Sequence, residues 1–94
     1  MKDKLDSSSV DFLIDAVLSL KSRDEAAAFF DDLLTVAELK SMSQRLEVAR
    51  MLQNRETYQD ISVKTGASTA TISRVARALN YGKGGYNTVL GRII

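Results

Sequence analysis

The chain has 94 residues, 45% of them hydrophobic, with a formal net charge of +1 and neither His nor Cys. A chain of this length forms one small domain, residues 1–94, for which dimerisation would help to cover apolar surface. The missing His and Cys exclude disulfides, thiolate chemistry, the usual zinc ligands and the usual general base, so we expect neither enzymatic activity nor a cofactor.

The sequence shows no signal for a membrane or for export. No apolar run approaches the ~20 residues that a bilayer-spanning helix requires. The first nine residues are rich in charge and serine, unlike a signal peptide. We therefore expect a cytoplasmic protein that does not contact a membrane.

Helical periodicity dominates the first part of the chain, which contains no proline. The serines at 7–9 supply an N-cap for a first helix that ends near Lys21. Its apolar residues recur at helical spacing: Val10, Leu13, Ile14, Val17 and Leu18. Ser22 or Asp24 opens a second helix through Leu34. The buried side of this helix is formed by Ala26, Phe29, Phe30 and Leu33.

The third helix is predicted from Thr35 to about Asn54, because Thr35 and Glu38 form a capping box. Its apolar residues again follow helical spacing: Leu39, Met42, Leu46, Ala49 and Leu52. These three helices, residues 1–54, carry more apolar surface than one thin helical layer can cover. We expect them to hold a homodimer; the alternative is that the first two helices fold back on the third within one chain.

Residues 57–79 are the most informative part of the chain. Thr57 caps a fourth helix and Ser68 a fifth, and Gly66 between them stands where a left-handed turn favours glycine. This pattern is typical of a helix-turn-helix, which lays its second helix in the major groove of double-stranded DNA. A helical hairpin without a ligand is the alternative. The fifth helix ends at residues 80–82, with Gly82 as a left-handed stop, and a short sixth helix follows over residues 84–94.

The exposed face predicted for the fifth helix is small and hydrogen-bonding, or cationic, and carries no acid. Short side chains let a backbone approach base edges, and arginine reaches phosphates or guanine. The residues of this face are Ser68, Thr69, Ala70, Thr71, Ser73, Arg74 and Arg77, with Lys64 and Lys83 nearby. The distribution of charge along the chain supports DNA binding by this motif. Residues 1–37 carry eight acids and four bases, and residues 38–94 carry four acids and nine bases. The basic part is thus the part that holds the motif, as phosphate binding requires.

The stretch from Asp32 to Leu79 resembles the tryptophan repressor superfamily, and still more its repressor-related branch. The most specific pieces are LLT at 33–35, Arg45 ten positions after Thr35, and GASTATISR at 66–74. The resemblance implies a six-helix, all-α fold, an intertwined dimer and sequence-specific repression of transcription.

The resemblance also assigns roles within the motif. Residues matching Thr69, Ala70 and Ser73 face bases in the family, and the residue matching Thr71 touches phosphate. Gln59 or Asp60, at the start of the fourth helix, stands near a position where the repressor presents a base-reading arginine, and we count Gln59 among the DNA-binding residues. Because this chain has no arginine there, we do not expect it to share the repressor's operator sequence.

The tryptophan site of the family is altered here. Two arginines that hold tryptophan match Arg45 and Arg74, but the glycine and the serine that complete the pocket are replaced by Val75 and Ala78. A valine side chain would fill the volume of the indole, and alanine offers no hydrogen bond. We expect a vestigial effector site that does not bind tryptophan, with Arg74 on DNA and Arg45 paired with an acid. Whether another effector exists stays open.

Two other functions remain compatible with the sequence. The chain could be a nucleoid or replication-associated DNA-binding protein without a repressor role. It could also be a protein-interaction adaptor that keeps the fold and has lost DNA binding.

Overall fold

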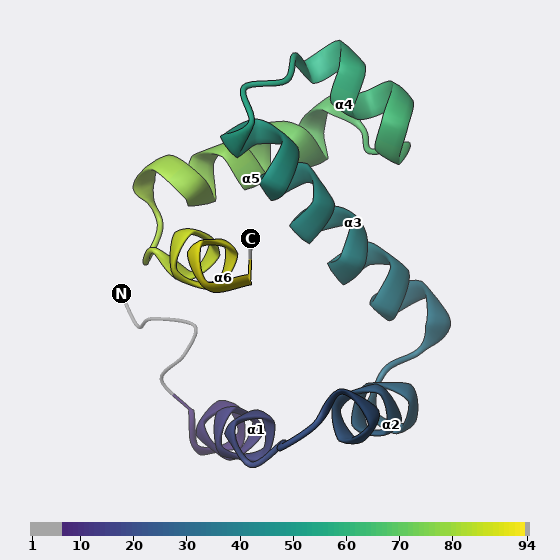
Figure 1. Ribbon diagram of the computed structural model, residues 1–94, viewed down its shortest axis with the longest axis vertical. Coiled ribbons are helices and arrows are strands. Elements are labelled where there is room, and N and C mark those ends of the chain that lie inside the picture. Colours follow the sequence, from purple (N-terminus) through teal and green to yellow (C-terminus); the bar gives the residue numbers. More distant parts are fainter. Residues whose placement is uncertain (1–6, 94) are drawn as a thin grey trace. The chain divides into compact units, whose positions relative to one another are not determined.

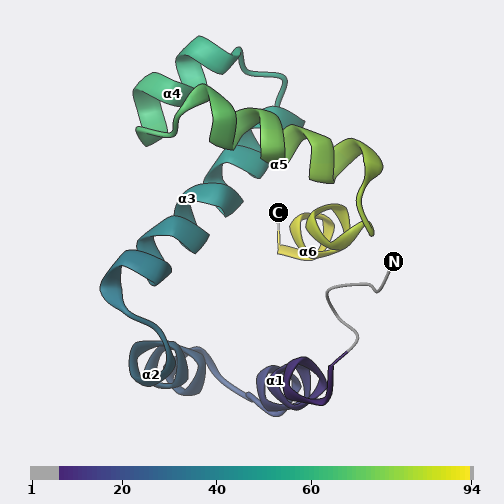
Figure 2. The ribbon, with the colours of Figure 1, turned by 180° about the vertical axis from the view of Figure 1, so that it is seen from behind.

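The computed structural model describes residues 7–93, which form six helices and no strand (Figures 1 and 2). The helices are α1 (Ser8–Leu18), α2 (Arg23–Leu33), α3 (Val36–Gln53), α4 (Tyr58–Thr65), α5 (Thr69–Tyr81) and α6 (Gly85–Ile93). The prediction of an all-α, six-helix fold is confirmed. Among these residues, no helix is both long and apolar enough to cross a membrane.

The chain divides into two compact units, residues 1–36 and 37–94. The prediction that residues 1–94 form one domain, with dimerisation helices over 1–54, stays a prediction.

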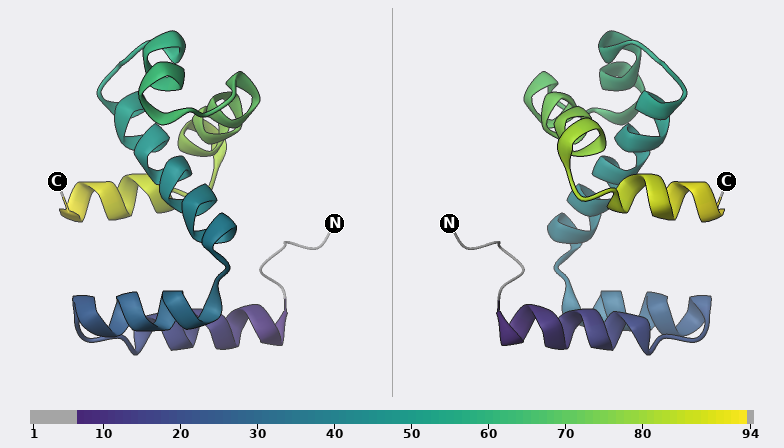
Figure 3. Two further views of the ribbon diagram at one scale, coloured as in Figure 1. Left: turned by 90° about the vertical axis from the view of Figure 1, so that its right-hand side faces the viewer. Right: turned by 90° about the vertical axis from the view of Figure 1, so that its left-hand side faces the viewer.

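In the first unit, α1 and α2 run antiparallel to each other (Figure 3). Local caps explain where they begin: the Ser7 hydroxyl accepts from the Val10 N–H, and the Ser22 hydroxyl accepts from the Glu25 N–H, each at 3.1 Å. The Glu25 carboxylate accepts in turn from the Lys21 N–H at 3.0 Å.

The first helix is shorter than predicted, because it ends at Leu18 and not near Lys21. The Ser19 hydroxyl donates to the Ala16 carbonyl at 2.6 Å, and the Leu20 N–H donates to the Val17 carbonyl at 3.2 Å. These bonds tighten the last turn and satisfy carbonyls that a longer helix would use. The spacing of apolar residues predicts where a helix can form, but it does not show that side-chain and turn bonds will end the helix early.

The apolar side chains of the first unit are not covered by the unit itself, since none of residues 7–36 is buried. Phe12 and Leu18 are each 76% exposed. Phe29 and Phe30 are half-buried, with ring centroids 5.9 Å apart. An apolar groove of about 570 Å³ is lined by Ser9, Phe12, Leu13, Ala16, Phe29, Leu33 and Leu34.

The second unit holds the hydrophobic core. In Figures 1 and 2, α5 crosses the C-terminal part of α3, with α4 near one end of α5 and α6 near the other. All four helices contribute to one cluster: Val48, Ala49, Ile61, Ala67, Ile72, Val75 and Leu90, with Met51, Leu52, Leu79 and Tyr86 packed against it. This core fixes the position of α5 among its neighbours, and so decides which face of α5 is left to solvent.

The prediction that Gly82 provides a left-handed stop is wrong. Gly82 has φ −86° and ψ −154°, and the left-handed residue of this turn is Gly84, with φ +80°. Gly82 is needed for a different reason, since a Cβ there would collide with the Ala78 carbonyl oxygen. The Gly82 N–H donates to that same carbonyl at 2.9 Å, which draws the two backbones together.

Candidate nucleic-acid interface

The turn between α4 and α5 is built from glycine and from two side-chain bonds. Gly66 has φ +75°, the left-handed conformation that the sequence predicted for it. The Ser62 hydroxyl donates to the Ala67 carbonyl at 2.9 Å, and the Thr65 hydroxyl accepts from the Ala67 N–H at 3.1 Å. Ala67 itself is buried in the core. These bonds satisfy both backbone polar groups of Ala67, the buried residue of the turn.

Two further bonds secure the ends of the helices at this turn. The Ser68 hydroxyl accepts from the Thr71 N–H at 3.1 Å, as expected of an N-cap. The Gln44 side chain of α3 donates to the Thr65 carbonyl at 3.1 Å. This second bond joins residues 21 positions apart and fastens the C-terminal end of α4 to α3.

The helix α5 has one buried face and one exposed face. Ile72 and Val75 are buried, and Ala76 and Leu79 are half-buried. Five of the exposed residues follow the spacing i, i+1, i+4, i+5, i+8, which places them on one side of the helix: Thr69, Ala70, Ser73, Arg74 and Arg77. We call these five residues the α5 outer face. Thr71 is half-buried between the two faces, and Ser68 is exposed just before the helix.

The surroundings of the α5 outer face are cationic. Residues 61–94 contain five bases and no acid. The side chains of Arg74 and Arg77 make no hydrogen bond or ion pair with another of residues 7–93. Their guanidinium groups are therefore available to phosphates or base edges. Lys83, just beyond α5, is also exposed.

Lys64, at the end of α4, is paired with an acid instead. Its ammonium donates to Glu56 at 2.6 Å, in an ion pair with 57% of the Lys64 side chain exposed. The hydrogen bond that Lys64 donates to Glu56 and the negative charge of Glu56 raise the pKa of Lys64, and partial desolvation opposes that shift. Lys64 therefore stays charged, and its ammonium is ion-paired with Glu56. Gln59, near the start of the same helix, is exposed.

The residues of the predicted vestigial effector site separate into a surface part and a core part. Arg74 and Ala78 are exposed, whereas Val75 is 2% exposed and packs in the core. The half-buried Arg45 donates to the Ser41 hydroxyl at 2.9 Å. Among residues 7–93 it makes no ion pair, so the expectation that Arg45 pairs with an acid is wrong: within α3, its neighbour one turn back is a serine.

The comparisons with known proteins agree with this architecture. The family model described as "Trp repressor protein" matches residues 8–94. The chain belongs to the Trp repressor family. This is a family of DNA-binding regulators, and the resemblance inferred from residues 32–79 therefore extends over nearly the whole chain.

Three similar proteins match this chain over most of their length. The chain is 54% identical over 91 residues to "Uncharacterized protein YerC" of Bacillus subtilis, covering 97% of this chain and 88% of that protein. A solved structure described as a TrpR-like protein from Eubacterium eligens matches with a TM-score of 0.91 and 55% identity, over 98% of this chain and 95% of the other. A solved structure from Staphylococcus aureus matches with a TM-score of 0.89 and 50% identity, over 96% and 90% of the two chains.

Two residues that shape this interface were not singled out from the sequence. Glu56 pairs with Lys64 eight positions away, and Gln44 caps α4 from another helix. Neither spacing is a recognised pattern, because both contacts depend on how the loop between α3 and α4 returns the chain. Residue type and spacing therefore offer no signal for either contact.

Proposed function

We propose that this chain is a sequence-specific DNA-binding transcription regulator that acts as a repressor, is not an enzyme and works in the cytoplasm as a homodimer. In this proposal α4 and α5 form a helix-turn-helix, and α5 lies in the major groove. The observation that carries the proposal is the α5 outer face: short polar residues and unpaired arginines on a helix whose other face is locked into the core.

The chemistry of the α5 outer face suits base reading and phosphate binding. Thr69, Ala70 and Ser73 are short enough for the helix backbone to come close to base edges. Arg74 and Arg77 extend beyond them and supply the charge that phosphates attract. Because residues 61–94 lack acids, no carboxylate of this segment repels the DNA backbone.

The exposed apolar surface of the first unit supports the homodimer. The groove is lined almost wholly by apolar residues, and contiguous exposed apolar surface is typical of an interaction site, whereas a monomer usually exposes apolar side chains singly. A second copy would bury these side chains. A two-fold dimer would also present two reading helices to half-sites about 34 Å apart, the spacing of successive major grooves.

We further propose that DNA binding does not require tryptophan. In the family the indole lies against a glycine, and Val75 replaces that glycine here with a side chain that is 2% exposed. Calorimetry on the intact protein tests this directly. We expect no saturable heat with tryptophan at millimolar concentration, and a saturable heat would overturn this part of the proposal.

The proposal as a whole is tested by selecting binding sites from a pool of randomised DNA duplexes with the purified protein. A repressor of this kind should enrich one site with two-fold symmetry, and its affinity should fall steeply with salt. Salt-dependent binding without enrichment would instead indicate an architectural DNA-binding protein. Absence of any DNA binding would contradict the proposal and favour a protein-interaction adaptor.

A further inference from the structure

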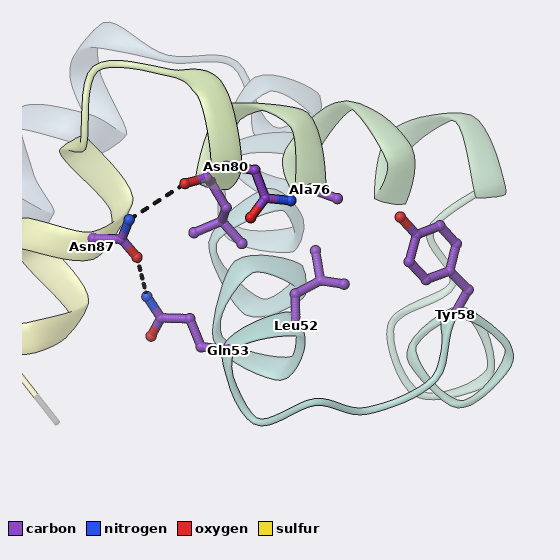
Figure 4. A pocket seen from close by; sticks show the side chains of 7 residues that line it. Leu52, Gln53, Tyr58, Ala76, Asn80 and Asn87 are labelled. Atoms are coloured by element: carbon purple, nitrogen blue, oxygen red, sulfur yellow. Dashed lines mark hydrogen bonds between the residues drawn. The ribbon is translucent and has the colours of Figure 1, made fainter.

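A cleft with neutral polar walls lies in the second unit, away from the α5 outer face (Figure 4). Its volume is about 370 Å³, within the range of small-molecule sites. The walls come from all four helices of the unit: Leu52 and Gln53 of α3, Tyr58 of α4, Ala76, Leu79 and Asn80 of α5, and Asn87 of α6.

One wall of this cleft is held in place by long-range hydrogen bonds. The Gln53 side-chain amide donates to the Asn87 side-chain oxygen at 2.7 Å, and the Asn87 amide donates to the Leu79 carbonyl at 3.4 Å. These bonds join α3, α6 and α5. The carboxamide planes of the wall are therefore oriented before any ligand arrives, which lowers the cost of binding.

Other polar groups of the cleft have no protein partner. The Asn80 amide and the Tyr58 hydroxyl make no hydrogen bond with any of residues 7–93. Figure 4 shows both directed toward the same space, with Leu52 between them. The cleft thus combines free donors and acceptors, an aromatic ring and an aliphatic floor.

The chemistry of these groups restricts the ligand. None of the lining residues is charged, so a charged ligand would find no counter-charge there. Asparagine and glutamine amides match the adjacent donor and acceptor on the edge of a purine. An aromatic ring such as that of Tyr58 stacks on the face of a base.

We propose that this cleft is an effector site for a purine nucleobase or nucleoside. The binding step is independent of DNA, but the effector role rests on the proposed function. An occupant would bridge α3 and α5 and would thereby change the freedom of the helix that carries the α5 outer face. By linkage, a ligand that alters DNA affinity must itself bind differently to the DNA-bound protein.

The first experiment titrates the full chain, without DNA, with adenosine and guanosine, and uses ribose as the control compound. The side-chain amide resonances of Gln53, Asn80 and Asn87 are followed by ¹⁵N–¹H spectroscopy. We expect saturable shifts of these three resonances with a purine nucleoside and none with ribose. Absence of saturation at millimolar nucleoside would overturn the proposal and would leave the DNA-binding proposal untouched.

Variants locate the site. Asn80→Leu removes the amide at nearly constant volume on an exposed position, and it should weaken nucleoside binding by about tenfold or more. Asn54→Leu makes the same chemical change at an exposed residue that does not line the cleft, and it should leave binding unchanged. Tyr58→Phe, which keeps the ring and removes only the hydroxyl, provides a second probe. Equal binding by the wild type, Asn80→Leu and Tyr58→Phe would place the site elsewhere and refute the proposal.

The effector role is measured on the DNA site enriched by selection. A saturating purine nucleoside should change the DNA affinity of the wild type by about fivefold or more. The DNA affinity of Asn80→Leu should be the same with and without the nucleoside. Unchanged affinity in the wild type would refute the effector role. If the protein bound no DNA at all, the proposed function would fail, and the nucleoside titration would still report on the cleft.

Discussion

Val75 offers a test of how the core and the altered effector site are related. The side chain is 2% exposed and packs with Ile72, Ile61 and Leu90 of the core cluster. Replacing Val75 by glycine restores the residue of the family pattern and removes the side chain that would fill the volume of the indole. The same change removes a fully buried aliphatic group from a small core, so we expect it to be costly.

The magnitude follows from two terms. Burial of a valine side chain contributes about 1.5–3 kcal/mol, and glycine in a helix interior costs about 0.5 kcal/mol relative to valine, whose own helix propensity is below that of alanine. Val75→Gly should therefore lower the free energy of unfolding by about 3 kcal/mol. Ala78→Gly, on the same helix but exposed, should lose only the propensity term of about 1 kcal/mol.

The assay is urea unfolding followed by circular dichroism at one fixed protein concentration, because dimerisation would make stability depend on concentration. The difference between Val75→Gly and Ala78→Gly isolates the burial of the valine. Equal decreases in the two variants would refute the reasoning that Val75 is a core residue. If the decrease is as large as expected, the double variant Val75→Gly with Ala78→Ser restores two elements of a tryptophan pocket, but in a protein whose free energy of unfolding is lower.

Three further predictions concern the interface and the dimer. Ser73→Ala and Thr69→Ala should relax discrimination among operator variants without loss of stability, and identical sites selected by wild type and both variants would show that bases are read elsewhere. Glu56→Gln should return the pKa of Lys64 toward 10.5, as measured by NMR titration, and should steepen the salt dependence of DNA binding. In the wild type, the stability that this ion pair contributes is present below pH 10.5 and is lost as pH rises through the raised pKa of Lys64. The intact chain of 10.3 kDa should sediment as a dimer at micromolar concentration, and deletion of residues 1–22 should cause aggregation; sedimentation as a monomer would contradict the dimer.

Helix starts and the turn at Gly66 could be predicted from the sequence because their causes are local. Ser7, Ser22, Thr57 and Ser68 each cap a helix through a bond to a residue three positions ahead. Such bonds depend on residue type and spacing alone, and the sequence displays both.

Features that depend on where distant segments meet could not be predicted. The conformation predicted for Gly82 is wrong because residues 82, 84 and 85 are all glycine, and only packing decides which of them turns. Arg55 adopts φ +62° in the loop before α4, although its residue type gives no sign of a left-handed conformation. The bond between Gln53 and Asn87 joins residues 34 positions apart.

The α5 outer face illustrates both situations. Its composition was evident from the sequence, and the structure buries the opposite side of α5 through Ile72 and Val75. The ion pair between Lys64 and Glu56 was not evident from the sequence, so the structure corrects the expectation for Lys64 alone.

The central claim is that Arg74 and Arg77 bind DNA, and fluorescence anisotropy on the selected site tests it most directly. Arg74→Gln and Arg77→Gln are compared with Arg23→Gln, a matched removal of one charge on exposed α2. We expect Arg74→Gln and Arg77→Gln each to bind DNA at least about tenfold more weakly. The slope of log affinity against log salt should fall by about one unit for each phosphate that is no longer bound. Arg23→Gln should bind as the wild type does. Wild-type affinity and slope in both Arg74→Gln and Arg77→Gln would contradict the account.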